Sequence, residues 1–540
     1  MVTIDKKKSY FFYWGIFFLL MVIKFGYYGF EYFPVMDDWI QYGTYSLSDS
    51  PFQEIILKTQ MYTVRPLAGL SDIYIIGRFW NDLSAVFFII TILHALSCYF
   101  FVRVFEYNKI KTGFVFLITY GLSPFLTEAT YWISASSRLV VSMFWLSLAL
   151  FFLCKYLYET NKKRDLVLFF VSQLLSLGYY EPVVLLGFVC ALFLILPNIK
   201  SKVGKIAGIA TIVNYYIIAI YYNSFSARGQ LTVRGELAAG GTIEDYYETL
   251  KNIFKMLGNN DIYFYARGFM RGFNVILEDG AYLFLAIAVI LSILVFFASK
   301  QDSIERRISK NFRKLLLGII LFIAPFILFF IIQFNWISFR NAFTSFIGLG
   351  LILEALFDMG TVNLFLRRIK DVLICVVVFV FLIVNVSEIT DFRAVSLADE
   401  KVADGIIEAS SGLGLLEGEK GAYIFNARNS YVELNKEYNE HINNITSSDW
   451  LLTGALRGVA ENIDIKMLTP VFINKPVYLF PDKYEDYIFL GIDNDLSVHA
   501  LDYERLGAYI YRFYRNDGTL FGRLEYRYGY AFLSQNTVAR

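Results

Sequence analysis

Two adjacent carboxylates, Asp37 and Asp38, follow a long apolar run near the N-terminus and are the first residues with the chemistry of an active site. Neighbouring acids repel each other, so one of them can keep its proton above the usual pH range and then serve in proton abstraction. A hydrated loop start explains the same pair without any chemistry. The sequence leaves both interpretations open.

Further charged residues lie in short connections between apolar runs. Glu128 and Arg138 flank one such connection, Glu181 lies in a tight hairpin, and Arg340 is the strong charge of a late connection. Arg65 precedes a proline in the first long connection. Because a charge exposed to lipid is costly, we expect these side chains to face a shared site and to bind substrate there.

Each of these residues also has a purely structural explanation. Glu181 directly before Pro182 suits the start of a helix, where proline fits the first turn and the helix dipole favours an acid. The three arginines suit lipid phosphates at a membrane surface. Glu128 fits a solvated turn.

Aromatic residues accompany the charged ones. Trp39 follows the acid pair and Tyr180 precedes Glu181. An interfacial belt of Trp and Tyr is expected in any membrane protein. Acids beside aromatic faces are also what a carbohydrate site requires, because rings pack on sugar faces and carboxylates bind hydroxyl groups. We therefore include Trp39 and Tyr180 among the candidate substrate-binding residues.

The composition restricts the class of protein. Of 540 residues, 56% are hydrophobic and only 18% are charged, which indicates a membrane protein. The net charge of +1 argues against a nucleic-acid partner. All four cysteines lie in apolar runs, so the sequence offers neither a disulfide framework nor a CxxC metal site.

Apolar runs of near-membrane length predict about eleven transmembrane helices. They lie at 10–30, 84–105, 112–126, 139–158, 166–178, 183–197, 206–222, 281–298, 315–333, 343–357 and 371–389.

Alternate connections between these runs are about fourfold denser in Lys and Arg, which is typical of cytoplasmic loops. This asymmetry places the N-terminus inside and the C-terminus outside a cell membrane. It also places two long loops, 31–83 and 223–280, on the outer side together with every candidate site residue. The segment Glu244 to Gly258 has the pattern of an amphipathic helix lying in the interface.

The composition changes at about residue 391, so we expect a membrane domain at 1–390 and an extracytoplasmic α/β domain at 391–540. Helices are predicted at 397–411 and 446–461, and strands at 422–426, 476–480, 487–490 and 507–514.

This layout resembles the GT-C superfamily of glycosyltransferases that use polyprenyl-phosphate sugars, and within it the bacterial GtrII-like and related cell-surface glycan glycosyltransferases. The likeness rests on the acid pair after the first span and on three short motifs. These are Arg65-Pro66, Tyr180-Glu181-Pro182 and Ser338-Phe339-Arg340.

The resemblance implies an aspartate of the first outer loop as general base, which here is Asp37, with Asp38 as its alternate or partner. It also implies that a basic residue of a late outer loop, here Arg340, holds the lipid phosphate. The resemblance assigns no specific role to Arg65, Arg138 or Glu181, so their roles rest on topology.

Such an enzyme would move a sugar, with inversion, from a polyprenyl-phosphate donor to a glycan or lipid-linked acceptor. It would need no cofactor, although the acids are compatible with a divalent metal. A flippase or transporter, a glycan polymerase or ligase, and a receptor that acts through its outer domain are the alternatives.

Overall fold

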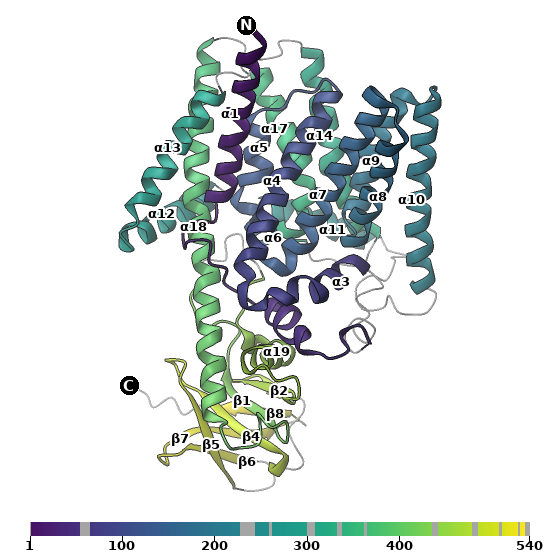
Figure 1. The fold of residues 1–540 in the computed structure, drawn as a ribbon. Coiled ribbons are helices and arrows are strands. Elements are labelled where there is room, and N and C mark those ends of the chain that lie inside the picture. The colour runs from purple at the N-terminus through teal and green to yellow at the C-terminus, as the bar shows by residue number, and fades with distance from the viewer. Residues whose placement is uncertain are drawn as a thin grey trace.

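The computed structural model is a helical bundle joined to a C-terminal β domain (Figure 1). The bundle and the domain lie end to end, with the N-terminus at the far end of the bundle (Figure 1). We call the end of the bundle next to the β domain the domain end. The structure describes residues 2–53, 65–226, 243–258, 262–299, 308–331, 337–360, 364–434, 441–477, 484–506, 510–527 and 530–534.

Six helical segments in these ranges are long and apolar enough to cross a membrane. They are Ile76–Tyr107, Ile133–Thr160, Lys202–Tyr221, Tyr282–Ser299, Phe339–Gly360 and Phe365–Ala409. Three shorter apolar helical segments are Phe11–Ile23, Phe114–Thr130 and Val183–Asn198. All eleven predicted runs contain helix, and six of them meet the length and hydropathy expected of a crossing.

The helices that build the bundle pack side by side, with α7 between α4 and α8 (Figure 1). Their bounds are α1 (Val2–Ile23), α4 (Leu83–Tyr107), α5 (Phe114–Leu117), α7 (Ile133–Lys155), α8 (Lys163–Tyr179), α9 (Val183–Ile195), α10 (Lys202–Ser226), α13 (Tyr282–Ser299), α14 (Ile308–Ile323), α15 (Ile327–Ile331), α17 (Phe346–Gly360) and α18 (Leu364–Ala409).

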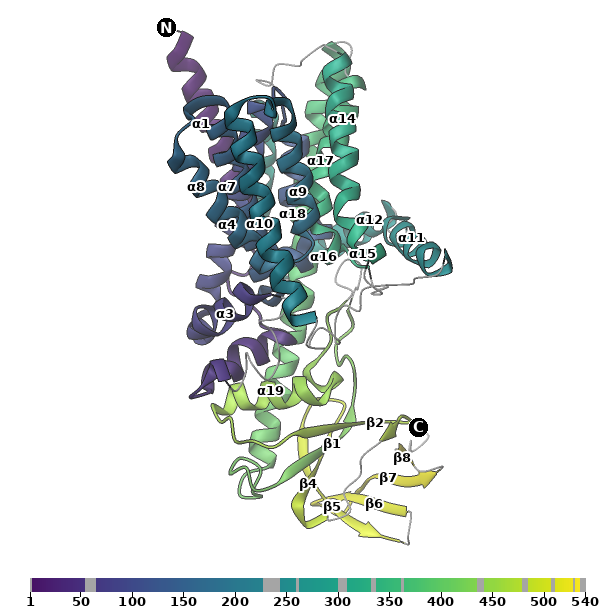
Figure 2. The same ribbon diagram turned by 90° about the vertical axis from the view of Figure 1, so that its right-hand side faces the viewer.

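Short helices cover the domain end, and two amphipathic helices extend from the side of the bundle. The short ones are α3 (Pro66–Tyr74), α6 (Thr127–Thr130) and α16 (Phe339–Ala342). The amphipathic pair, α11 (Ile243–Gly258) and α12 (Ile262–Glu278), stands out from the bundle in Figure 2. The predicted amphipathic helix at Glu244 to Gly258 is confirmed as α11.

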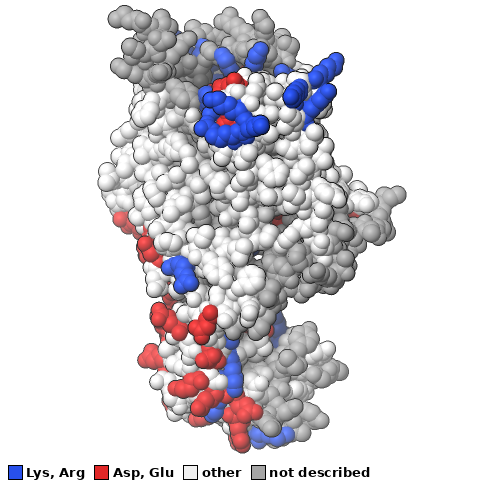
Figure 3. All heavy atoms as spheres, turned by 45° about the vertical axis from the view of Figure 1, so that its right-hand side comes forward, with Lys and Arg blue, Asp and Glu red and all other residues white. Residues whose placement is uncertain are grey.

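Charge is segregated along the long axis of the molecule. On the face drawn in Figure 3, Lys and Arg gather at the end far from the β domain, an almost uncharged band follows, and Asp and Glu gather on and near the β domain. An apolar band between two charged ends is the surface that a bilayer requires, because charged groups are costly in hydrocarbon. The fold is therefore that of a membrane protein.

The long helix α18 joins the bundle to the β domain without a break (Figure 1). Its 46 residues extend over about 70 Å at 1.5 Å per residue, which is more than twice the thickness of a hydrocarbon core. The boundary predicted at 390/391 lies inside this helix, whose last turns already pack against the sheet. A continuous helix fixes the orientation of the domain relative to the bundle.

The described residues of the C-terminal domain form an eight-stranded mixed sheet with the order β2-β1-β4-β5-β6-β7-β8-β3. Strand β1 pairs in parallel with β2 and β4, and the other pairs are antiparallel. The strands are β1 (Gly421–Ala427), β2 (Leu468–Phe472), β3 (Pro476–Val477), β4 (Tyr487–Ile492), β5 (Val498–Arg505), β6 (Ile510–Arg515), β7 (Leu520–Arg527) and β8 (Tyr530–Ser534).

Helix α19 (Asp449–Ala460) links β1 to β2 and lies between the sheet and the bundle (Figure 1). The predicted helix at 446–461 and the predicted strands at 422–426 and 487–490 are confirmed as α19, β1 and β4. The other two predicted strands coincide in part with β3 and β6, and their residues 478–480 and 507–509 lie outside the described ranges.

The C-terminal domain docks on the first long connection of the bundle. Helix α19 packs against the π-helical turn η1 (Trp39–Thr44), and Thr44 Oγ1 donates a hydrogen bond to the Gly454 carbonyl at 2.8 Å. A Cβ atom on Gly454 would lie 2.2 Å from Ile40 Cγ1, so only glycine allows this close approach. The domain therefore covers the segment that carries the acid pair.

Candidate functional site

The charged residues selected from the sequence all come from segments at the domain end of the bundle. Asp37 and Asp38 lie between α1 and η1, and Arg65 directly precedes α3. Glu128 lies on α6 and Arg138 in the first turns of α7. Tyr180 and Glu181 connect α8 to α9, and Arg340 lies on α16. These segments lie at one end of the bundle because helices that cross a bundle alternate in direction.

Asp38 is fully buried and accepts four hydrogen bonds. Its Oδ2 accepts from the Tyr32 hydroxyl at 2.5 Å and from the Val35 amide at 3.1 Å. Its Oδ1 accepts from the Ser134 amide at 3.0 Å and from Ser134 Oγ at 2.7 Å. A carboxylate at the amino end of a helix is favoured by the helix dipole, and Ser134 is in the first turn of α7. Asp38 therefore fixes the start of α7 to the first connection.

Burial raises the pKa of Asp38 to about 7, although its four hydrogen bonds act to lower it. The usual acceptor positions of the carboxylate are occupied by these protein donors. Asp37 is only half-buried and acts electrostatically on the Arg138 guanidinium. The structure thus separates the two neighbouring acids by environment, with Asp38 fully buried and Asp37 partly exposed.

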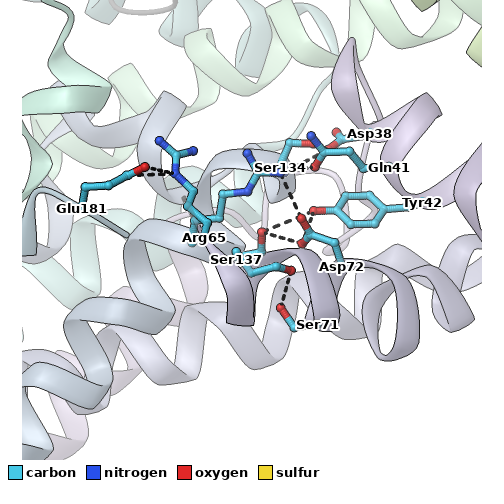
Figure 4. Close-up of polar contacts among 11 residues, drawn as sticks. Asp38, Gln41, Tyr42, Arg65, Ser71, Asp72, Ser134, Ser137 and Glu181 are labelled. Carbon is cyan, nitrogen blue, oxygen red and sulfur yellow. Dashed lines mark hydrogen bonds and ion pairs between the residues drawn. The ribbon is translucent and has the colours of Figure 1, made fainter. Parts of the chain in front are cut away.

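Arg138 forms a buried ion pair that the sequence analysis did not foresee. Its Nη2 donates to Asp72 Oδ2 at 3.0 Å and to Gln41 Oε1 at 2.9 Å. The hydroxyl groups of Tyr42 and Ser137 contact the other oxygen of Asp72 at 3.4 and 3.3 Å. Figure 4 shows Gln41, Tyr42 and Ser137 around Asp72. A buried arginine needs such an acid, and the only signal in the sequence is an aspartate within the otherwise mostly apolar segment that forms α3.

Arg65 pairs with Glu181 across two connections. Arg65 Nε lies 2.9 Å from both carboxylate oxygens of Glu181 (Figure 4). The guanidinium carbon also lies 4.6 Å from the centre of the Tyr180 ring, a cation–π geometry. Tyr180 OH donates to Asn341 Oδ1 at 3.5 Å. The hairpin between α8 and α9 thus contacts both the first connection and α16.

Of the three arginines, Arg340 has the longest distance to its acidic partner. Its Nε lies 3.6 Å from Glu128 Oε1, beyond hydrogen-bond distance, and its guanidinium lies 5.0 Å from the Trp132 ring centre. The structure describes no hydrogen bond from this guanidinium to another residue of the described ranges. Arg340 therefore keeps donors that Arg65 and Arg138 use on protein carboxylates.

Glu128 is almost fully buried, which excludes the solvated turn that its sequence context also allowed. Its Oε1 contacts Nδ1 of His441, a residue of the C-terminal domain. The sequence around His441 carries no signal of a contact with Glu128. Most of the residues that form the bundle lie between the two positions in the chain. Only the docking of the domain brings the two residues together.

Tyr180 contacts Arg65 through its ring and Asn341, the neighbour of Arg340, through its hydroxyl. Burial raises the pKa of its hydroxyl, and the charges of Arg65, Arg340 and Arg138 act to lower it while that of Glu181 acts to raise it. We call the three arginines at the domain end, together with their acidic partners, the arginine cluster. It comprises Arg65, Arg138 and Arg340 with the acids Glu181, Asp72 and Glu128.

Trp39 packs at the junction between the first connection and the C-terminal domain. Its side chain is buried in the hydrophobic core there, and its ring lies edge-on to Trp80 at 5.3 Å. Burial of this large ring stabilises the junction.

Within the described ranges, no group of three or more His, Cys, Asp or Glu side chains is arranged to hold a metal ion. The acids of the arginine cluster are instead each paired with a guanidinium. Such pairs bind anions when a phosphate or carboxylate replaces one acid.

Comparison with known proteins finds no matching family model and no similar curated sequence.

Proposed function

We propose that this protein is a membrane glycosyltransferase that moves a sugar from a polyprenyl-phosphate-linked donor to a cell-surface glycan or a lipid-linked acceptor. The observation that carries this proposal is the arginine cluster at one end of an apolar bundle, in which Arg340 lacks a hydrogen-bonded protein partner among the described residues. A lipid phosphate at the bilayer surface is an anion that such a site would meet.

Arg340 is the proposed ligand of the donor phosphate. Its guanidinium can donate two parallel hydrogen bonds to phosphate oxygens, and the Trp132 ring below it restricts its motion. Arg65 and Arg138 carry the same charge nearby but are bound to Glu181 and Asp72. They would raise the local positive potential and hold the surrounding connections in place.

Asp37 is the proposed general base. It would take the proton of the attacking acceptor hydroxyl as that oxygen bonds to the anomeric carbon of the sugar. The bond from the anomeric carbon to the phosphate oxygen breaks on the opposite face, so the configuration inverts. The polyprenyl phosphate leaves with its added negative charge beside Arg340. Asp38 has no direct part in this step, because its oxygens are engaged within the fold.

The proposal includes a GT-C-like bundle of about eleven crossings, with the arginine cluster on the outer face. The six long apolar segments, the three shorter ones and the helices α8 and α14 would supply these crossings. The basic end seen in Figure 3 would face the cytoplasm, as the distribution of Lys and Arg favours. The donor would then be a sugar already carried across the membrane on its lipid.

Sugar transfer by single variants tests the proposed base. Membranes containing Asp37→Asn, Asp38→Asn or the exposed control Asp49→Asn would be supplied with radiolabelled polyprenyl-phosphate hexoses, and label in the glycan fraction would be counted. We expect Asp37→Asn to lose at least about a hundredfold in transfer rate, as general bases typically contribute that much, and Asp49→Asn to keep full activity.

Two outcomes contradict the proposal in different ways. Full transfer by Asp37→Asn removes the general base. No transfer of any hexose by the unmodified protein, together with movement of the labelled lipid between leaflets, would favour a flippase instead.

A further inference from the structure

His441 brings the C-terminal domain into the arginine cluster. His441 is 5% exposed and is the first residue of the described segment 441–477. Its neighbour Ile442 is buried in the same hydrophobic core as the bundle helices. The loop that carries His441 is therefore seated in the bundle, although it belongs in sequence to the C-terminal domain.

The loop is held by defined hydrogen bonds on the side of the C-terminal domain. Asp399 of α18 accepts from Asn444 Nδ2 at 2.7 Å and from the Ile445 amide at 2.9 Å. Asn444 also receives the Tyr431 amide on its Oδ1 at 2.8 Å. These bonds fix the position of the loop relative to α18, so the imidazole of His441 is presented at a set place.

Glu128 has two cationic or potentially cationic neighbours on the same oxygen. Its Oε1 is in close contact with His441 Nδ1, whereas Arg340 Nε lies 3.6 Å away. The imidazole is thus the nearer partner of this carboxylate. Without the His441 imidazole, the Glu128 carboxylate would lower its free energy by moving into hydrogen-bond contact with the Arg340 guanidinium. The reason is that a buried charge without a partner is costly.

We propose that His441 is a positioning residue that holds Glu128 back from Arg340, so that the Arg340 guanidinium stays open to the phosphate of the lipid-linked substrate. This inference rests on the proposed function of Arg340. In the absence of His441, Glu128 and the phosphate would compete for the same donors. The C-terminal domain would then set the affinity for the lipid phosphate without touching it.

Binding of undecaprenyl phosphate to the full-length protein in nanodiscs tests this inference, with undecaprenol as the neutral control lipid. We expect His441→Ala to weaken binding of the phosphate about tenfold, which corresponds to the loss of one good interaction, and to leave undecaprenol binding unchanged. The other described histidine of the domain, His499, is 42% exposed and pairs with Asp493, so His499→Ala is the matched control and should bind as the unmodified protein does.

A rescue distinguishes positioning from a general loss of structure. Glu128→Gln removes the competing charge, so we expect His441→Ala combined with Glu128→Gln to bind undecaprenyl phosphate within about threefold of Glu128→Gln alone. Where His441→Ala fails to fold, His441→Gln keeps an amide donor near Glu128 and should fold with a smaller loss of affinity.

The outcomes separate this inference from the proposed function. If Arg340→Ala binds undecaprenyl phosphate as well as the unmodified protein does, the phosphate site itself is wrong. If Arg340→Ala loses binding but His441→Ala does not, or if Glu128→Gln brings no recovery, the role assigned to His441 is wrong and Arg340 keeps its own.

Discussion

At the scale of single residues, two neighbouring aspartates differ because of what surrounds them. Asp38 is buried under the start of α7 with four donors on its carboxylate, and Asp37 is half-buried. The arginines also differ, since Arg65 and Arg138 are hydrogen-bonded to acids while Arg340 rests on a tryptophan ring. The proposed chemistry therefore falls on the acid that is not fully buried and on the arginine whose ion pair is the longest.

Asp38 should make the stability of the protein depend on pH. Its pKa is about 7 in the folded state and about 3.8 without the fold, so the folded protein binds more protons between these values. Its contribution to stability is thus full below about pH 4 and is lost as the pH rises to 7, by on the order of 4 kcal/mol at 1.4 kcal/mol per unit.

Melting temperatures of the detergent-solubilised protein at pH 5 and pH 8 check this sign. Relative to the unmodified protein, Asp38→Asn should melt lower at pH 5, because Asn cannot accept all four bonds, and should show a smaller fall between pH 5 and pH 8, because Asn does not ionise. Asp49→Asn serves as the control. An unchanged fall in Asp38→Asn would contradict the assignment.

At the scale of elements, the junction between α19 and η1 places the C-terminal domain over the first connection. Two glycines of α19 permit this contact, since Gly454 faces Ile40 and a Cβ on Gly43 would lie 3.3 Å from Gly458 Cα. Trp39 fills the space beside them. The six residues of η1 therefore connect the acid pair to the C-terminal domain.

Gly454→Val should separate α19 from η1. The added side chain would overlap Ile40, and overpacking of this kind typically costs about 1–3 kcal/mol. We expect faster hydrogen exchange in residues 39–44 and, because the loop of His441 shifts with the domain, weaker binding of undecaprenyl phosphate. Gly15→Val is the control, since no atom lies within 4 Å of a Cβ at that position. Equal exchange in both variants would show that the junction tolerates the change.

Charged and apolar residues are distributed unevenly along the long axis of the protein. A basic end, an apolar band and an acidic β domain follow one another along it (Figure 3). The continuous helix α18 connects the band to the domain, and the arginine cluster lies where they meet. A substrate with a lipid tail and a polar head would be held across the same boundary.

Accessibility of single cysteines tests the proposed orientation. Lys200→Cys lies at the basic end and Asn516→Cys in a turn of the β domain, and both positions are exposed. The four native cysteines are buried or half-buried. In intact cells, we expect a membrane-impermeant maleimide to label Asn516→Cys and to label Lys200→Cys only after permeabilisation. The reverse pattern would place the arginine cluster in the cytoplasm and favour a nucleotide-sugar donor.

The class of protein and the coarse positions of its helices follow from local features of the amino-acid sequence. Hydropathy and charge are local properties of a segment, so apolar runs such as 84–105 and 371–389 coincide with α4 and α18. The same local signals found β1, β4 and α19, and the alternation of helix direction brought Asp37, Arg65 and Arg340 to one end. They missed β2, β5, β7 and β8, whose strand pairing depends on partners elsewhere in the sheet.

The contacts between side chains of the site depend on the packing of the folded chain. The pairing of Arg138 with Asp72, the engagement of Asp38 by Ser134, the burial of Trp39 and the arrival of His441 at Glu128 all join segments that are distant in sequence. Such contacts are set by how helices and domains pack, and packing is a property of the whole chain. A single sequence carries no local signal for such contacts, so they become visible only in the folded structure.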